Sequence, residues 1–212
     1  MKGFLTGKLN TAGRIMFVLA GIAIGLSLLF SWWSLKLIAP MYPEGLEVNV
    51  YADKLGPQED ITILNTLNHY VGMKHLDEAD FPELIIIPWV VAAVALLSIL
   101  TALIRRNWAA VGTLAIFAIG GVIGLTRMYH WLSTFGTTLD PKSAITIEPF
   151  VPPILGKNVL AGGTYTTYSN FGIGVYLLLA AMLIMVIVLW KFRQRDPKAP
   201  SNKKKPATAG DR

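Results

Sequence analysis

The chain contains no cysteine, and only 15% of its 212 residues are charged. The missing thiols exclude disulfide bonds, thiolate metal sites and covalent haem attachment through a Cys-x-x-Cys-His motif. The low charge, a hydrophobic content of 53% and a mean hydropathy of +0.51 are atypical of a soluble domain. The sequence therefore predicts an integral membrane protein.

Four apolar runs approach the roughly 20 residues that a helix needs to cross a hydrocarbon core of about 30 Å. We predict transmembrane helices over residues 15–38, 84–104, 108–131 and 171–190. The first run follows three basic residues, but it is too long for a cleaved export signal and lacks a convincing cleavage site, which favours an uncleaved anchor. Tryptophans recur near the predicted span edges, as expected of rings that favour the lipid headgroup level.

Lysine and arginine gather on one side of these four spans. They lie in residues 1–14, in the tight connection 105–107 and in the tail 191–212. The positive-inside rule makes this side cytoplasmic. The first long connection, 39–83, carries nine acidic residues against two lysines. We therefore predict a multi-pass protein of the bacterial inner membrane with both termini inside, and with loops 39–83 and 132–170 in the periplasm.

The net charge of +6 comes mostly from the inner rim and the tail. The tail after Asp196 is rich in lysine, proline and alanine, a composition that suits disorder and attraction to anionic lipid. We expect the lipid bilayer and membrane or periplasmic proteins as partners, and the charge does not imply nucleic acid binding.

Both outer loops have the patterns of folded segments. Leu46, Val48 and Val50 alternate with polar residues, which predicts a half-buried strand. The second loop alternates at Ile145 and Ile147 and then becomes rich in proline and glycine, which predicts irregular strands packed on the first loop. Together the two loops predict a small mixed α/β module.

A short helix is expected to begin after Asp60, as N-cap, and to stop at Gly72. Five of its residues recur at helical spacing and share one face, namely Ile61, Leu64, Asn65, Asn68 and His69. Within the third span, Gly120, Gly121 and Gly124 predict close packing of membrane helices.

Histidine and methionine supply the candidate metal ligands. They are His69, Met73, His75, Met128, His130 and Met41, all in the loops or near outer span edges. Imidazole and thioether together suit copper, and Cu(I) in particular, because soft ligands are favoured and no thiolate is present. If the helix ends at Gly72, His75 can fold back towards His69 and Met73.

Structural roles compete with this interpretation. A histidine at a helix C-terminus interacts with the last carbonyls without a metal, and methionine fills gaps in packing. The acidic residues Asp77, Glu78 and Asp80 favour a solvated face over acid–base catalysis or cation gathering. Haem ligation by His69 and His130 is disfavoured, because b-type haem ligands normally lie on helices inside the bilayer. An apolar lipid or quinone pocket between the helices stays open. Ion transport is disfavoured, because the spans lack central ionisable groups.

Several tracts of the chain resemble a family of small four-span bacterial membrane proteins. The resemblance is carried by residues 39–46, by residues 64–73 with their Leu-Asn-His-Tyr-Val-Gly-Met core, by Leu139-Asp140-Pro141 and by residues 152–157. Genes of that family, which has no firmly assigned activity, occur near those for periplasmic copper handling and nitrous oxide reductase maturation. The similarity spans most of the chain from the first predicted span to Gly163.

The resemblance implies copper delivery or assembly of a periplasmic copper enzyme, with His69 and Met73 as the matching residues. The family often has Tyr-Gly-His-Asn before Leu-Asp-Pro, where this chain has residues 135–138, Phe-Gly-Thr-Thr. A ligand role for that histidine is therefore absent here. His75 and Met41 do not clearly match the family.

We therefore predict an all-α integral membrane protein of four transmembrane helices, with a mixed α/β extracytoplasmic module built from its two outer loops. Its expected role is non-enzymatic, as a copper trafficking or metalloenzyme assembly factor. The alternative is a structural subunit of a larger respiratory or oxygenase-type membrane complex.

Overall fold

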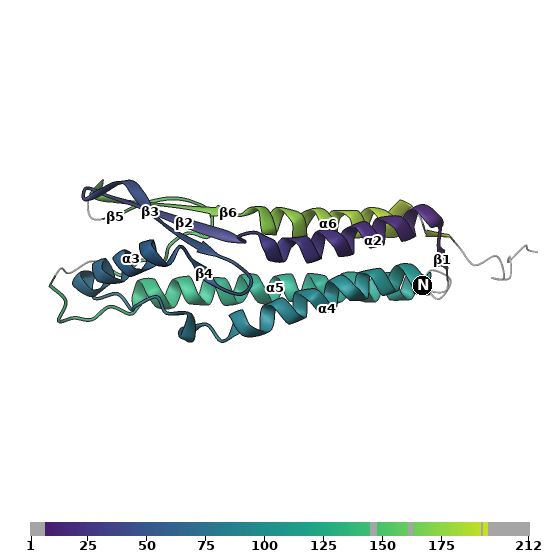
Figure 1. Ribbon diagram of the computed structural model, residues 1–212, viewed down its shortest axis with the longest axis horizontal. Helices are drawn as coiled ribbons and strands as arrows, with labels where there is room; N and C mark the ends of the chain where they lie inside the picture. The colour runs from purple at the N-terminus through teal and green to yellow at the C-terminus, as the bar shows by residue number, and fades with distance from the viewer. Residues whose placement is uncertain (1–6, 145–147, 161–162, 192, 195–212) are drawn as a thin grey trace, which may run out of the picture.

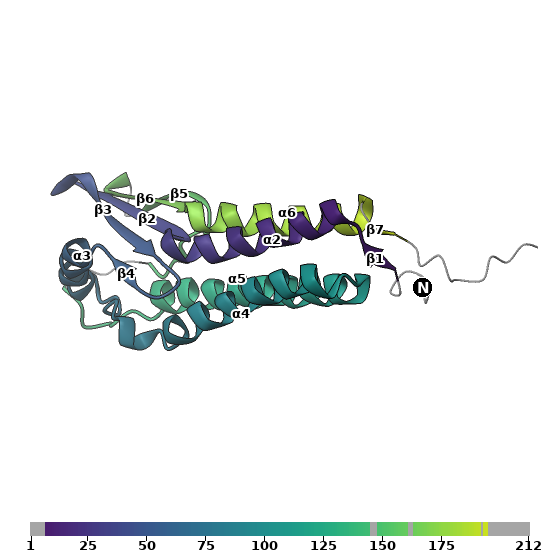
Figure 2. The same ribbon diagram turned by 45° about the vertical axis from the view of Figure 1, so that its right-hand side comes forward.

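The computed structural model describes residues 7–144, 148–160, 163–191 and 193–194. The molecule is elongated, with long helices at one end and a sheet with a short helix at the other (Figure 1). Figure 2 shows that α2 and α6 form one layer of the helical end, while α4 and α5 form the other. The sheet continues from the layer that contains α2 and α6.

Four helices are long and apolar enough to cross a membrane. They are α2 (Thr11–Leu26) with its 3₁₀ extension η1 (Ser27–Leu29), α4 (Glu83–Ile104), α5 (Asn107–Thr137) and α6 (Ile173–Lys191). Helices α4 and α6 lie within a few residues of the predicted second and fourth spans. This arrangement is compatible with a multi-pass membrane protein.

The first predicted span, 15–38, is wrong at its outer end. The helical part stops at Leu29, and residues 33–39 form a strand instead. In this strand Trp33, Leu35 and Leu37 line one face. The intervening polar residues mark the period of two that is typical of a strand. A hydropathy average over a whole span hides this pattern, because apolar residues continue from the helix into the strand.

The third predicted span, 108–131, is shorter than the helix that the structure contains. Helix α5 continues to Thr137 because its last turns pack on the module rather than ending at the span edge. The Trp131 ring lies edge-on to the Phe81 ring, with centroids 4.0 Å apart. The Phe135 ring stacks on the Phe81 ring, with centroids 5.6 Å apart. The segment between α5 and α6 therefore begins after Thr137, not at the predicted residue 132.

The end of the molecule opposite the sheet gathers the basic segments. Strand β1 (Lys8–Leu9) pairs with β7 (Arg193–Gln194), so the start of α2 and the end of α6 are tied together. The Leu9 amide donates to the Arg105 carbonyl over 3.0 Å, which adds the turn between α4 and α5 to the same cluster. Arg105 closes α4 in the left-handed conformation, with φ of 61°.

Helix α2 is the centre of the bundle and packs on both α4 and α6. Its contact with α4 is close at Gly21, where an added Cβ would lie 2.8 Å from the Ala95 carbonyl oxygen. Ser98 of α4 donates its hydroxyl to the Phe17 carbonyl over 2.7 Å. A small residue and an interhelical hydrogen bond thus join these helices, as is common in apolar bundles.

The predicted glycine packing on α5 is wrong within this chain. A Cβ added at Gly120, Gly121 or Gly124 would meet no atom within 4 Å in the part of the chain that the structure describes. The three glycines therefore face away from the other described helices. Close approach is made by α2 through Gly21 instead.

The module contains a five-stranded antiparallel sheet of order β4–β3–β2–β6–β5. Its strands are β2 (Trp33–Ala39), β3 (Tyr42–Val50), β4 (Leu55–Gly56), β5 (Gly156–Leu160) and β6 (Tyr165–Phe171). Pairing of β2 with β6 joins the segment after α2 and the segment before α6 in one sheet. The predicted mixed α/β module and the strand around Leu46, Val48 and Val50 are confirmed. Ile145 and Ile147 lie outside the described residues.

Helix α3 (Gln58–Val71) covers part of the sheet, and the 3₁₀ turn η2 (Glu78–Asp80) precedes α4. The predicted N-cap at Asp60 is wrong, because α3 starts three residues earlier, at Gln58 after Pro57. The Asp60 carboxylate instead accepts the Glu47 amide over 2.7 Å, which connects α3 to β3. Ile61, Leu64 and Asn68 form the buried face, as the spacing predicts, whereas His69 is exposed.

Candidate functional site

The end of α3 positions the histidine-rich segment. Gly72 has φ of 74°, and both its amide and that of Met73 donate to the Asn68 carbonyl, the latter over 2.9 Å. A left-handed residue at this position turns the chain away from the helix axis, and glycine adopts it without a Cβ clash. The predicted helix stop at Gly72 is therefore confirmed.

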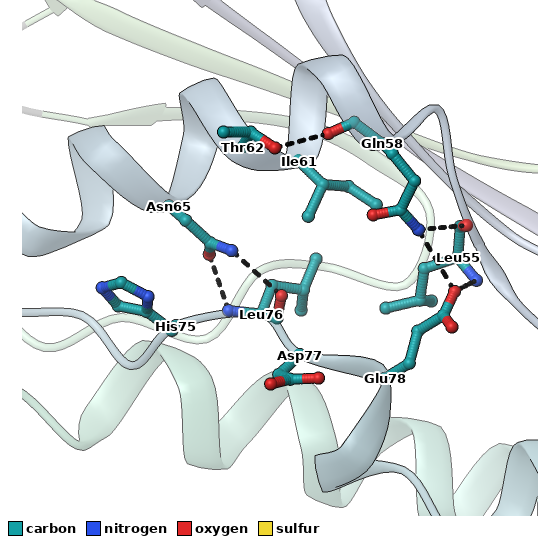
Figure 3. A pocket seen from close by; sticks show the side chains of 9 residues that line it. All are labelled: Leu55, Gln58, Ile61, Thr62, Asn65, His75, Leu76, Asp77 and Glu78. Carbon is teal, nitrogen blue, oxygen red and sulfur yellow. Dashed lines mark hydrogen bonds between the residues drawn. The ribbon is translucent and has the colours of Figure 1, made fainter.

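The segment after the turn is held against α3 by one side chain. Asn65 donates from Nδ2 to the Leu76 carbonyl over 3.0 Å, and its Oδ1 accepts the Leu76 amide over 2.7 Å. Figure 3 shows both hydrogen bonds, with His75 next to Leu76 along the chain. This two-bond contact, here called the Asn65 clamp, fixes the chain that carries His75 beside α3.

The clamp brings two histidines together. The imidazole rings of His69 and His75 lie edge to face, with centroids 6.4 Å apart and planes at 82°. Both residues are exposed, and neither imidazole makes a hydrogen bond within the described part of the chain. Their nitrogen lone pairs are therefore free for a ligand. We call these residues the His69–His75 pair.

The predicted methionine ligands do not share this exposed face. Met73 is half-buried and lines a large cavity of the module, and its backbone bridges to Leu139. Met41, in the turn between β2 and β3, lines the same cavity and is 77% exposed. The structure thus separates the two thioethers from the two imidazoles of the predicted set.

Met128 and His130 both belong to α5 and line neither cavity of the module. His130 is exposed on its helix. Among the described residues, no group of three or more His, Cys, Asp or Glu side chains could hold a metal ion. The six candidate ligands therefore lie in three places, of which the His69–His75 pair contains two imidazoles.

The acidic residues beside this pair have structural partners. Asp77 caps η2 by accepting the Ala79 amide over 3.0 Å. Glu78 accepts the Leu55 amide over 2.9 Å, and Asp80 pairs with Lys74 at 2.8 Å. These two hydrogen bonds and the ion pair show that the carboxylates stabilise the turn that precedes α4.

The large cavity was not predicted from the sequence. It has a volume of about 990 Å³ and lies between the sheet, α3 and the outer end of α5. Its walls include Trp33, Leu35 and Leu37, whose alternation was the available signal for a half-buried sheet face. The sequence left open a lipid or quinone pocket between the membrane helices. This cavity lies in the module instead.

The module thus presents an exposed imidazole pair and a separate apolar cavity. Two neutral imidazoles can ligate a transition metal such as copper, and the apolar cavity can hold a hydrophobic molecule. Comparisons with protein-family models, with curated proteins and with solved structures find no match for the chain.

Proposed function

We propose that the chain is a non-enzymatic accessory factor in copper trafficking or in assembly of a periplasmic copper enzyme. It would be anchored in the bacterial inner membrane with both termini inside. Four helices of sufficient length support the anchor, and the separation of the basic turn from the sheet supports the orientation. The module would then lie on the periplasmic side.

The separation of the imidazoles in the His69–His75 pair carries the copper proposal. Bonds between a metal and an imidazole nitrogen are about 2.0 Å long, so two rings on one ion have centroids roughly 6 Å apart when the bonds are collinear. The observed centroid distance of 6.4 Å matches this separation. Both side chains are exposed, which leaves them room to rotate towards one ion.

The preference for copper follows from the ligand chemistry and the family resemblance. Cu(I) accepts two-coordinate and soft-ligand sites, and imidazole is a common copper ligand. Met73 lies between the two histidines along the chain, but its side chain lines the cavity of the module. The proposed first ligands are thus His69 and His75.

Competition for Cu(I) between the purified full chain and a chromogenic chelator tests the proposal. The wild type should withdraw one equivalent, and His69→Ala or His75→Ala should abolish the withdrawal. His130→Ala is the matched control, since it removes an exposed imidazole on α5, and it should bind like the wild type. Equal uptake by all four proteins would refute the assignment.

A second function, as a structural subunit of a larger membrane complex, is favoured by a different observation. Gly120, Gly121 and Gly124 leave a stretch of α5 without bulk, and no described helix occupies it. Small residues let helix backbones approach closely, so this stretch suits the helix of a partner subunit. Gentle detergent extraction should then recover a partner at fixed stoichiometry, whereas recovery of a monomer alone would contradict this role.

A further inference from the structure

The cavity of the module is separate from the proposed copper site. Neither His69 nor His75 lines it, and its volume of about 990 Å³ lies near the top of the range for small-molecule sites. The walls are the inner face of the sheet, one side of α3 and the outer end of α5. An inference about its occupant therefore does not depend on the copper proposal.

The cavity exists because α3 covers only part of the sheet. The helix packs on β3 and β4, where Val48, Leu55 and Leu64 are buried. On the strands that α3 does not cover, Leu37 of β2 is only half-buried and Val159 of β5 is 51% exposed. These apolar walls lack partner atoms, so an apolar occupant would restore dispersion contacts and remove hydrocarbon surface from water.

One wall residue supplies an unused polar group. Thr167 of β6 lines the cavity and is 4% exposed, and its hydroxyl has no hydrogen-bond partner within the described part of the chain. An unpaired buried hydroxyl costs free energy, which a hydrogen bond to a ligand recovers. Rotation about χ1 exchanges the methyl and hydroxyl positions. The site therefore suits a molecule that is mostly apolar and has one polar end.

The cavity lies where the helices meet the module. Trp131 and Phe135, from the last turns of α5, form part of its wall. If the four helices cross a bilayer, these rings are at or just above the lipid headgroups, the level that aromatic residues favour. Met41 and Met73 add flexible, polarizable surface that adapts to chains of different shape.

We propose that this cavity binds one long acyl chain of an amphiphile taken from the membrane surface. The chain lies along the apolar inner face of the sheet, and the polar end hydrogen-bonds to Thr167. A free fatty acid and a phospholipid both offer this chemistry. Both reach the cavity from the adjoining headgroup region.

Photocrosslinking on the full chain in bilayers tests the proposal and distinguishes the two sources. One arm uses a free fatty acid with a mid-chain diazirine, and the other uses a phosphatidylcholine that carries the same chain. Peptide mass spectrometry should find adducts on β2 and on the outer end of α5 in at least one arm. The arm that labels these segments identifies the source. Failure of both probes to label them, while lipid-facing positions of α6 are labelled, would overturn the proposal.

Two neighbouring substitutions on β2 supply a matched pair. Leu37→Trp puts a larger side chain into the cavity, and Ile38→Trp adds the same ring one residue later, on the opposite face. Labelling of α5 should fall about tenfold in Leu37→Trp, the effect of losing ~1.4 kcal/mol of binding free energy. It should stay unchanged in Ile38→Trp. Equal labelling in the two variants would contradict a chain inside the cavity.

A second variant replaces threonine with valine, which has nearly the same shape and should leave folding unchanged. Thr167→Val removes the hydroxyl without filling the cavity, and Thr166→Val is its control on the other face of β6. The first should reduce labelling by the fatty acid probe about fivefold, as expected for one lost hydrogen bond. The second should not. Equal labelling by both variants would show that Thr167 does not bind the polar end.

Discussion

At the scale of single residues, the candidate site depends on a glycine and an asparagine rather than on its ligands alone. Gly72 turns the chain out of α3, and Asn65 fixes the returning segment through Leu76. His75 reaches His69 only because both residues act together. Substitutions that leave both imidazoles in place should therefore still change metal binding.

Gly72→Ala should destabilise the module. Alanine is strained at a φ of 74°, and its Cβ would lie 2.8 Å from the Asp140 carbonyl oxygen. We expect a loss of about 1–3 kcal/mol in the free energy of unfolding, measured by thermal denaturation in detergent. Gly25→Ala, where the added Cβ meets nothing within 4 Å, is the control and should be neutral or stabilising. A Gly72→Ala protein as stable as the control would disprove the strain argument.

Asn65→Leu should weaken Cu(I) binding while leaving the fold intact. The change removes both hydrogen bonds of the clamp, each worth about 1 kcal/mol, so His75 loses its fixed position. The chelator competition should report at least a tenfold weaker affinity, a difference of ~1.4 kcal/mol. Thr66→Val, on the exposed side of the same helix, should bind like the wild type. Unchanged affinity in Asn65→Leu would mean that the clamp does not position the ligand.

At the scale of elements, the packing of α2 on α4 explains why one glycine is sensitive and others are not. Gly21→Leu should disrupt the bundle, since its side chain would collide with the Ala95 carbonyl and with Ile99. Overpacking of this kind costs about 1–3 kcal/mol, which should appear as a lower melting temperature in detergent.

Gly120→Leu is the matched substitution for this test. It adds the same bulk on α5, where nothing lies within 4 Å, and the isolated protein should melt as the wild type does. If α5 contacts a partner subunit, the same variant should lose that partner on extraction. A melting temperature lowered as much as in Gly21→Leu would show that α5 packs differently.

Sequence periodicity predicted the apolar helices, the strand at Leu46 and the stop at Gly72, because each depends on local composition. It did not separate β2 from the first helix, since the apolar run continues across Trp33. The stop at Gly72 also predicted that His75 can fold back towards His69, but the sequence did not predict the cavity or the Asn65 clamp. Both depend on contacts between separate segments, of β2 with β6 and of Asn65 with Leu76, that a local pattern does not contain.

At the scale of the whole molecule, the absence of cysteine allows a direct test of orientation. Thr62→Cys adds a single thiol on the exposed side of α3, and Thr11→Cys adds one at the opposite end of the molecule. An impermeant maleimide on cells with a permeabilised outer membrane should label the first variant. It should label the second only after lysis. The reverse pattern would put the module in the cytosol and remove the basis for a periplasmic role.

Two of the long helices, α2 and α6, join the sheet almost without linkers. Only residues 30–32 separate η1 from β2, and only Gly172 separates β6 from α6. The Gly172 amide donates to the Trp32 carbonyl over 2.9 Å, and the Gly174 amide donates to that of Ser31 over the same distance. The module consequently cannot rotate freely relative to α2 and α6. The sheet therefore stays at a fixed distance from these helices, and a tilt of α2 against α6 would twist it directly.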